Sequence, residues 1–213
     1  MKSREPEEPR RAYRSPRRRE QAAGTRERIL DSAARLFTER GFDGAAIAAI
    51  AADAEVSPET IYAAFRNKRT LLGELVRRAV RGGDQAPVPE QAGPRAVAAA
   101  RDPHEQLRLF AADIVLRLER VGPLLEVLTT AARAHAELAA LLARIHAERR
   151  ANLAALVAAL AAGGALRAEP EEALDTVWAM ASPELHRLLT GTRGWTRERY
   201  CEWLAASLAA LLL

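Results

Sequence analysis

The chain has 213 residues, of which 49% are hydrophobic and 5% aromatic, enough apolar surface for one large or two small packed domains. Its net charge is only +4, and its one cysteine, Cys201, excludes an intrachain disulfide and a cysteine-based metal site. Runs of β-branched residues with a period of two do not occur, whereas helical periods recur throughout, so we expect an all-α protein.

The compartment is inferred from the cysteine and from the apolar runs. Cys201 is interpreted as a small core residue in a reducing environment, with redox sensing as the alternative. The first residues are charged and carry no apolar segment of the signal-peptide type. The longest apolar run, residues 151–166, is too short to cross a bilayer. We therefore expect a soluble, cytoplasmic protein with no membrane partner.

Residues 1–24 carry eight basic and four acidic side chains, so their net charge equals the +4 of the whole chain. Three prolines and almost no large apolar residues predict a disordered basic arm, because such a segment buries too little surface to offset its loss of conformational entropy. Two interpretations stay open. A basic arm of this kind adds minor-groove contacts and counterion release where it precedes a DNA-binding unit, or it is a solvated tail.

The folded part is predicted to begin with a helix over residues 25–40, which Thr25 caps and Gly41 ends. Apolar residues then recur at helical spacing over residues 47–51 and stop at residues 53–56. A helix this short, ended so soon, implies a sharp turn into the next element.

That next element starts with a cap, a first-position proline and an acidic residue, in Ser57-Pro58-Glu59. Ile61 and Phe65 lie one turn apart and are expected to face inward. Thr60 and Tyr62 then point outward, with hydroxyl groups close to the helix start, where phosphate oxygens bind well. Two short helices at a sharp angle, the second exposed, are the geometry of a helix-turn-helix motif.

These segments resemble the TetR family of transcriptional regulators from about Thr25 to Val80. The matching strings are TRERILDSAARLF with Gly41-Phe42, IAADAEVS, TIYAAF, and Asn67-Lys68 at the start of the next helix. The resemblance implies that Thr60, Tyr62 and Lys68 contact the DNA backbone. For Lys68 the alternative is an ordinary surface lysine.

The chain departs from the family pattern at the start and in the turn of the motif. Ala45 and Ala46 stand where the family often has a hydroxyl residue, which removes a phosphate contact. Glu55 stands where a glycine is common, so we expect it to adopt a positive φ at a cost of roughly 1 kcal/mol.

Few side chains of the second helix can read DNA bases. Glu59 and Arg66 can hydrogen-bond to base edges, and Ala63 or Ala64 can touch a thymine methyl group. The predicted DNA-binding residues are Ser57, Glu59, Thr60, Tyr62, Arg66 and Lys68.

Asn67 is predicted to cap a helix over residues 68–81, which completes a helix-turn-helix domain of residues 25–81. Glycine and proline in residues 82–101 predict a flexible connection without helix. Residues 102–213 then form a second, helical domain. Its predicted helices run from Asp102 to Gly122-Pro123, from Leu124 to about Arg133, from about Ala136 to Ala162, from Glu169-Pro170 with a kink or restart at Ser182-Pro183, and from Thr196 onward.

The last helices carry more apolar residues than one face holds, which suggests a partner surface. The resemblance implies that two such helices pack against their copies in a two-fold homodimer. The alternative is that these residues fill the chain's own core. The predicted interface residues are Leu185, Leu188, Tyr200, Trp203, Leu204, Leu208 and Leu211.

The resemblance also implies a small-molecule effector, bound in the second domain among apolar walls and a few polar groups. The alternative for each candidate is that it is an ordinary core or surface residue with no ligand contact. The predicted pocket residues are Phe110, Ile114, His146, Trp178 and Met180.

We therefore expect an N-terminal three-helix DNA-binding domain followed by a C-terminal helical regulatory and dimerisation domain. Its partners are double-stranded DNA, a second copy and a small-molecule effector, and its function is that of a ligand-responsive repressor on a palindromic operator. The histidines lack metal-ligand spacing and no catalytic motif occurs, so we expect no enzyme, no cofactor and no metal. The alternative function is a helical ligand-binding or protein-interaction module that has lost DNA binding.

Overall fold

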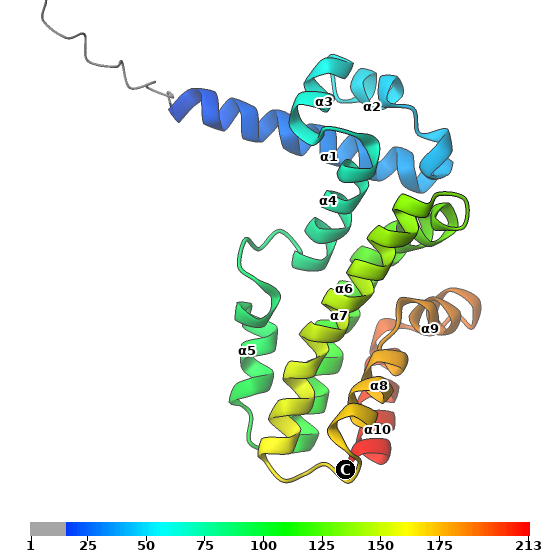
Figure 1. Cartoon of the computed structure of the whole chain (residues 1–213). Coiled ribbons are helices and arrows are strands. Elements are labelled where there is room, and N and C mark those ends of the chain that lie inside the picture. The colour runs from blue at the N-terminus through cyan, green and yellow to red at the C-terminus, as the bar shows by residue number, and fades with distance from the viewer. Residues whose placement is uncertain (1–15) are drawn as a thin grey trace, which may run out of the picture.

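The computed structural model describes residues 16–213, in which all regular secondary structure is helical. The expected all-α class is thus confirmed, with an N-terminal helix-turn-helix domain and a C-terminal helical domain (Figure 1). The elements are α1 Pro16–Gly44, α2 Ile47–Asp53, α3 Pro58–Phe65, α4 Lys68–Arg81, the 3-10 turn η1 Val88–Glu90, α5 Ala92–Ala99, α6 Pro103–Ala132, α7 Ala136–Ala162, α8 Pro170–Met180, α9 Pro183–Arg187, the π-helical turn η2 Leu188–Thr192 and α10 Arg197–Leu212. No helix within residues 16–213 is long and apolar enough to cross a membrane.

Helix α1 begins earlier than the sequence predicts. Residues 16–24 are helical, so Thr25 lies inside the helix and does not cap it. The rest of the predicted disordered arm, residues 1–15, lies outside the described residues. A helix already held by its buried face extends one residue at a time without a new nucleation cost, which explains the extra turns. Near the other end, Gly41 interrupts α1 with φ 70° and ψ 178°, where the sequence placed the stop, and residues 42–44 add a short helical segment after this kink.

The segment 82–101, predicted to be a flexible connection without helix, contains η1 and α5 instead. The Gln91 side chain ties it down by donating hydrogen bonds to the carbonyls of Ala86 at 3.0 Å and Arg81 at 3.4 Å. Val97 is buried against α6. The prediction was wrong because the glycines and prolines of the segment indicate turns, whereas the contacts of Gln91 with the end of α4 and of Val97 with α6 cannot be seen in the sequence.

The predicted break at Gly122-Pro123 is also absent, and α6 runs unbroken through Pro123. Within a helix, proline removes one hydrogen bond and its ring crowds the carbonyl four residues earlier. The buried side chains of Val121, Leu124 and Leu125 hold the helix on both sides of this point. Tertiary packing therefore overrides the local signal, and the two helices predicted here are one.

The other predicted helix starts and ends are confirmed. Asn67, Asp102, Ser182 and Thr196 each accept a hydrogen bond from a first-turn amide, and α7 has the predicted bounds. The chain restarts at Ser182 as a separate helix, α9, rather than continuing α8 through a kink. These signals lie in neighbouring residues, which is why the sequence alone was sufficient.

Two hydrophobic cores lie along the molecule, and the long helices α6 and α7 run side by side through both (Figure 1). The N-terminal core joins α1–α4 to the second half of α6 and the first half of α7. The C-terminal core joins the remaining halves of α6 and α7 to α5, α8 and α10. The helix-turn-helix motif therefore has no core of its own, because α6 and α7 complete it.

Candidate DNA-binding surface and ligand cavity

Helix α3 lies at the outer end of the molecule beside α2, with its buried face formed by Ile61 and Phe65 (Figure 1). The Ser57 hydroxyl accepts a hydrogen bond from the Thr60 amide at 3.3 Å and so caps the helix as predicted. Of the predicted DNA-binding residues, Ser57, Glu59, Tyr62 and Arg66 are exposed and Thr60 and Lys68 are half-buried. The structure thus presents the whole predicted set along one helix and the start of the next.

The turn before α3 contains the backbone strain that the sequence predicted. Glu55 has φ 55°, and Arg66, just after α3, has φ 64°. Such angles are uncommon for residues with a side chain and cost roughly 1–2 kcal/mol each. Both ends of the α3 segment are therefore set by sharp backbone turns, which aim the helix outward.

Contacts from α1 hold this motif in place. The Arg26 guanidinium lies 4.2 Å from the centre of the Phe65 ring, and it donates a hydrogen bond to the Ala64 carbonyl at 3.3 Å. Arg35 pairs with Asp53, and the hydrogen bond from Arg35, followed by one from Ser32, lowers the pKa of that carboxyl. The ends of α2 and α3 are thus tied to one helix.

Lys68 is less free than a surface lysine. Its ammonium lies 4.6 Å from the centre of the Phe42 ring and donates to the Asp43 carbonyl at 3.4 Å. Burial lowers its pKa, and the charge of Asp43 partly offsets that effect. The charge is therefore held in a fixed place, beside the end of α3.

The turn between α6 and α7 contacts the same region. His135 Nε2 lies 2.9 Å from Asp43 Oδ1, and its ring packs edge-on against Phe42 at 5.6 Å between centroids. Arg69 pairs with Glu137. The C-terminal helices therefore contact the residues that position Lys68.

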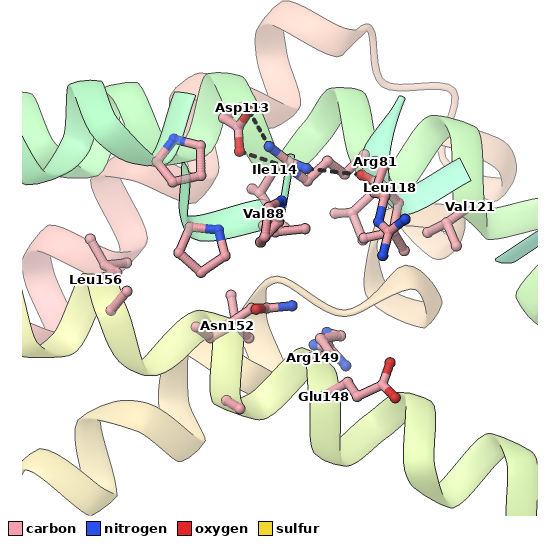
Figure 2. A pocket seen from close by; sticks show the side chains of 18 of the residues that line it. Arg81, Val88, Asp113, Ile114, Leu118, Val121, Glu148, Arg149, Asn152 and Leu156 are labelled. Atoms are coloured by element: carbon pink, nitrogen blue, oxygen red, sulfur yellow. Dashed lines mark hydrogen bonds and ion pairs between the residues drawn. The ribbon is translucent and has the colours of Figure 1, made fainter. Parts of the chain in front are cut away.

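A cavity of about 420 Å³ lies where the two cores meet, between α4, η1, α5, α6 and α7 (Figure 2). Its size is within the range of small-molecule sites. Of the predicted pocket residues, Phe110 and Ile114 line this cavity, whereas His146, Trp178 and Met180 are not among its lining residues. Two of the five predicted pocket residues therefore line the cavity, and the other three lie outside its lining.

Several charged side chains line the cavity walls. Arg117, buried among apolar residues, makes hydrogen bonds of 2.8 and 3.0 Å to both oxygens of Asp113 and one of 2.9 Å to the Val80 carbonyl at the end of α4. Figure 2 shows Arg81 across the cavity from Asn152 and Arg149. The α4 end of the cavity is thus polar.

Arg149 lies on the side where α7 meets α8. Its guanidinium lies 4.8 Å from the centre of the Trp178 ring and donates to the Trp178 carbonyl, which has no intrahelical partner so near the end of α8. His146 packs against the same ring at 5.8 Å. Burial lowers the pKa of Arg149 and of His146. His146 and Trp178, which were predicted to line the pocket, therefore lie on the side of Arg149 that faces α8.

Sequence reasoning missed Arg149, Arg81 and Asn152, although one signal was available. Arg149 falls at a core position of α7, four residues after Ile145 and four before Leu153, both buried. A cation within an apolar stripe is rarely left there unless it binds something. Only the apolar residues of this helix face were considered, and Arg149 was therefore overlooked.

The predicted dimer residues are also divided by the structure. Tyr200, Leu204 and Leu208 are fully buried in the C-terminal core and present no surface to a partner. Leu188 and Leu211 are exposed, and Leu185 and Trp203 are half-buried. The sequence could not separate the two groups because an apolar residue fits either environment.

Comparisons with known proteins agree with this geometry. A family model described as "Bacterial regulatory proteins, tetR family" matches residues 29–75. NalD of Pseudomonas aeruginosa, the secondary repressor of the MexAB-OprM multidrug efflux pump, has 24% sequence identity and a TM-score of 0.70 over 91% of this chain and 98% of that chain. No curated protein matches the chain in sequence.

Two further solved structures share the fold. The fatty acid degradation regulator FadR of Bacillus halodurans is 19% identical, with a TM-score of 0.69 over 86% of this chain and 94% of that chain. FadR of Bacillus subtilis, solved in complex with stearoyl-CoA, is 16% identical, with a TM-score of 0.67 over 88% of this chain and 99% of that chain.

The exposed α3 and the helical domain behind it define a TetR-like fold with an N-terminal helix-turn-helix domain. The resemblance to the TetR family of transcriptional regulators is confirmed by the family model over residues 29–75, and the solved structures share the fold of the whole chain.

Proposed function

We propose that this protein is a transcriptional regulator of the TetR type, a repressor that binds a palindromic operator as a homodimer and releases it when a small ligand binds. The observation that carries this proposal is the exposed polar face of α3, capped by Ser57 and followed by Lys68. A helix of this kind fits the major groove of duplex DNA.

The division of labour on that face follows from the chemistry of each side chain. Thr60, Tyr62 and Lys68 donate hydrogen bonds to phosphate oxygens, which fixes the helix on the duplex. Glu59 and Arg66 are placed to hydrogen-bond to base edges. The carboxyl of Glu59 has a lowered pKa, mainly because its own backbone amide donates to it and then because of Ser57, so it stays an acceptor.

A homodimer supplies the specificity that one α3 lacks. Two copies related by a two-fold axis bind half-sites roughly 34–36 Å apart in successive major grooves. Leu185, Leu188, Trp203 and Leu211 are the surface residues near the end of the chain that we assign to the interface.

Release by a ligand follows from the position of the cavity. Val76 and Val80 of α4 form part of its wall, and Lys68 starts the same helix. A ligand that displaces the end of α4 therefore moves Lys68 and, through Arg78 and its pairs with Glu27 and Asp31, the motif built on α1.

Selection of bound fragments from the source genome tests the proposal. We expect one recurring inverted repeat, with an affinity for duplex DNA that falls steeply as salt rises, because phosphate contacts release counterions. If no fragment is enriched and binding is absent even at low salt, the alternative module without DNA binding replaces this proposal.

A further inference from the structure

The charges around the cavity are not balanced. Arg77 pairs with Glu74 at 3.0 Å, and Arg117 pairs with Asp113. The remaining charged lining residues are Arg81, Arg149 and Glu148, of which Arg81 and Glu148 are exposed and Arg149 is half-buried. One net positive charge is thus left at the α4 end of a cavity whose other walls are apolar.

Arg149 retains unused hydrogen-bonding capacity. Its Nε and Nη1 atoms are buried and have no hydrogen-bond partner within residues 16–213. Buried polar atoms are paired in the great majority of cases, so each exception calls for an explanation. Both atoms are closed off from the open part of the cavity, so what Arg149 presents to it is its positive charge. The bond to the Trp178 carbonyl and the contact with the indole hold that charge in place.

The opposite end of the cavity is apolar. Figure 2 shows Leu156 at the end away from Arg81, with Val88 and Ile114 between them. Phe110 and Val97 also line the cavity. Hydrophobic walls with a few converging polar groups select a ligand with one polar end. A neutral apolar ligand would leave the positive charge of Arg149 and Arg81 without a counterion, and a cationic one would be repelled by it.

We infer that the ligand of this cavity is a small apolar molecule bearing one carboxylate, whose charged end is bound by Arg149 and Arg81 and whose apolar part lies among Phe110, Ile114 and Leu156. The inference deepens the proposed function, since it names the class of effector for the same cavity. Asn152, half-buried beside Arg149, is a further donor for the carboxylate.

Three probes with the same ten-carbon chain test the class: decanoate, 1-decanol and decyltrimethylammonium. Calorimetry of the full chain should show decanoate binding at least tenfold more tightly than decanol, and no binding of the ammonium compound. Trp178 lies against Arg149, so decanoate should also change the tryptophan fluorescence. Equal affinity for decanoate and decanol, or binding of the cation, overturns the inference.

Substitution locates the carboxylate. Arg149→Met should lower the affinity for decanoate at least tenfold and leave that for decanol unchanged, because only the charged contact is removed. Arg144→Met, at an exposed position on the same helix, is the matched control and should change neither. An Arg149→Met protein that binds decanoate like the parent contradicts the assignment.

If Arg149→Met does not fold, Arg81→Gln at the exposed mouth decides the question by the same comparison of decanoate with decanol. The outcome stays separate from the proposed function. Loss of the preference for the anion with operator binding intact refutes only the ligand class, whereas an inability to bind DNA refutes the regulator.

Discussion

One histidine in the C-terminal core, His186, is held in its neutral form. His186 is buried, its ring packs edge-on against Tyr200 at 4.8 Å between centroids, and its Nε2 has no hydrogen-bond partner in the part of the chain that the structure describes. Burial lowers its pKa, and the charge of Glu119 offsets this only in part. The neutral imidazole is therefore the form that the fold accepts.

A pH dependence of stability follows from that shift. The pKa of His186 is lower in the folded chain than the unperturbed 6.5, so the unfolded chain binds the proton more readily. Stability is fully present above about pH 6.5 and is lost as the pH falls through the folded pKa. Urea unfolding between about pH 7 and pH 5 should show this loss, and His186→Gln should reduce it. A slope that is the same in both proteins would assign the effect to another group, such as His146.

At the scale of elements, the start of α4 and the exposed face of α3 carry the predicted DNA contacts. Tyr62 is 51% exposed, so Tyr62→Phe removes a hydroxyl without disturbing the core. We expect Tyr62→Phe and Lys68→Ala each to weaken operator binding by about 1 kcal/mol, the usual net contribution of one hydrogen bond. Fluorescence anisotropy with the selected operator measures this. Arg193→Ala removes a positive charge from an exposed turn far along the chain and should leave affinity unchanged.

The packing of α5 on α6 depends on a glycine. A Cβ atom at Gly93 would lie 2.5 Å from Asp113 Cγ, whereas one at Gly122 of α6 would meet nothing within 4 Å. Gly93→Ala should therefore displace Asp113 from Arg117 and lower the free energy of unfolding by about 1–3 kcal/mol. Gly122→Ala is the control and should raise it by up to about 1 kcal/mol, since alanine is the better helix former. Thermal unfolding of both variants decides whether the close approach matters.

The same scale shows what the sequence could predict. Ser57 and Asn67 were read correctly as caps because a cap depends on residues three positions apart. Pro123 and α5 were read wrongly because distant helices hold them in place. Of the cavity, Phe110 and Ile114 were predicted by their place on an apolar stripe, and Arg149 was not, since a charged residue gives no apolar signal.

For the whole molecule, the central question is the homodimer. Leu211 is 55% exposed, so a glutamate there leaves the interior of the chain in place. Trp203 is half-buried and its ring lies 5.6 Å from those of Trp195 and Tyr200, so circular dichroism must show that its glutamate variant is folded. We expect Leu211→Glu and Trp203→Glu to sediment as monomers, because a charge in an apolar interface is costly. Leu116→Glu, at an exposed apolar position on α6, is the comparison. A dimer that survives Leu211→Glu and Trp203→Glu but not Leu116→Glu would move the interface to α6.

The core shared between α1–α4 and the ends of α6 and α7 limits where the chain can be divided into fragments that fold. A fragment ending after α4 would lose Val121, Leu125, Leu128 and Leu141, all buried against the helix-turn-helix motif. Chimeras that graft the operator-reading end onto another regulator would then need to carry the α6–α7 hairpin tip with it. A junction placed at residue 82, where the chain suggests one, would cut through a single packed interior.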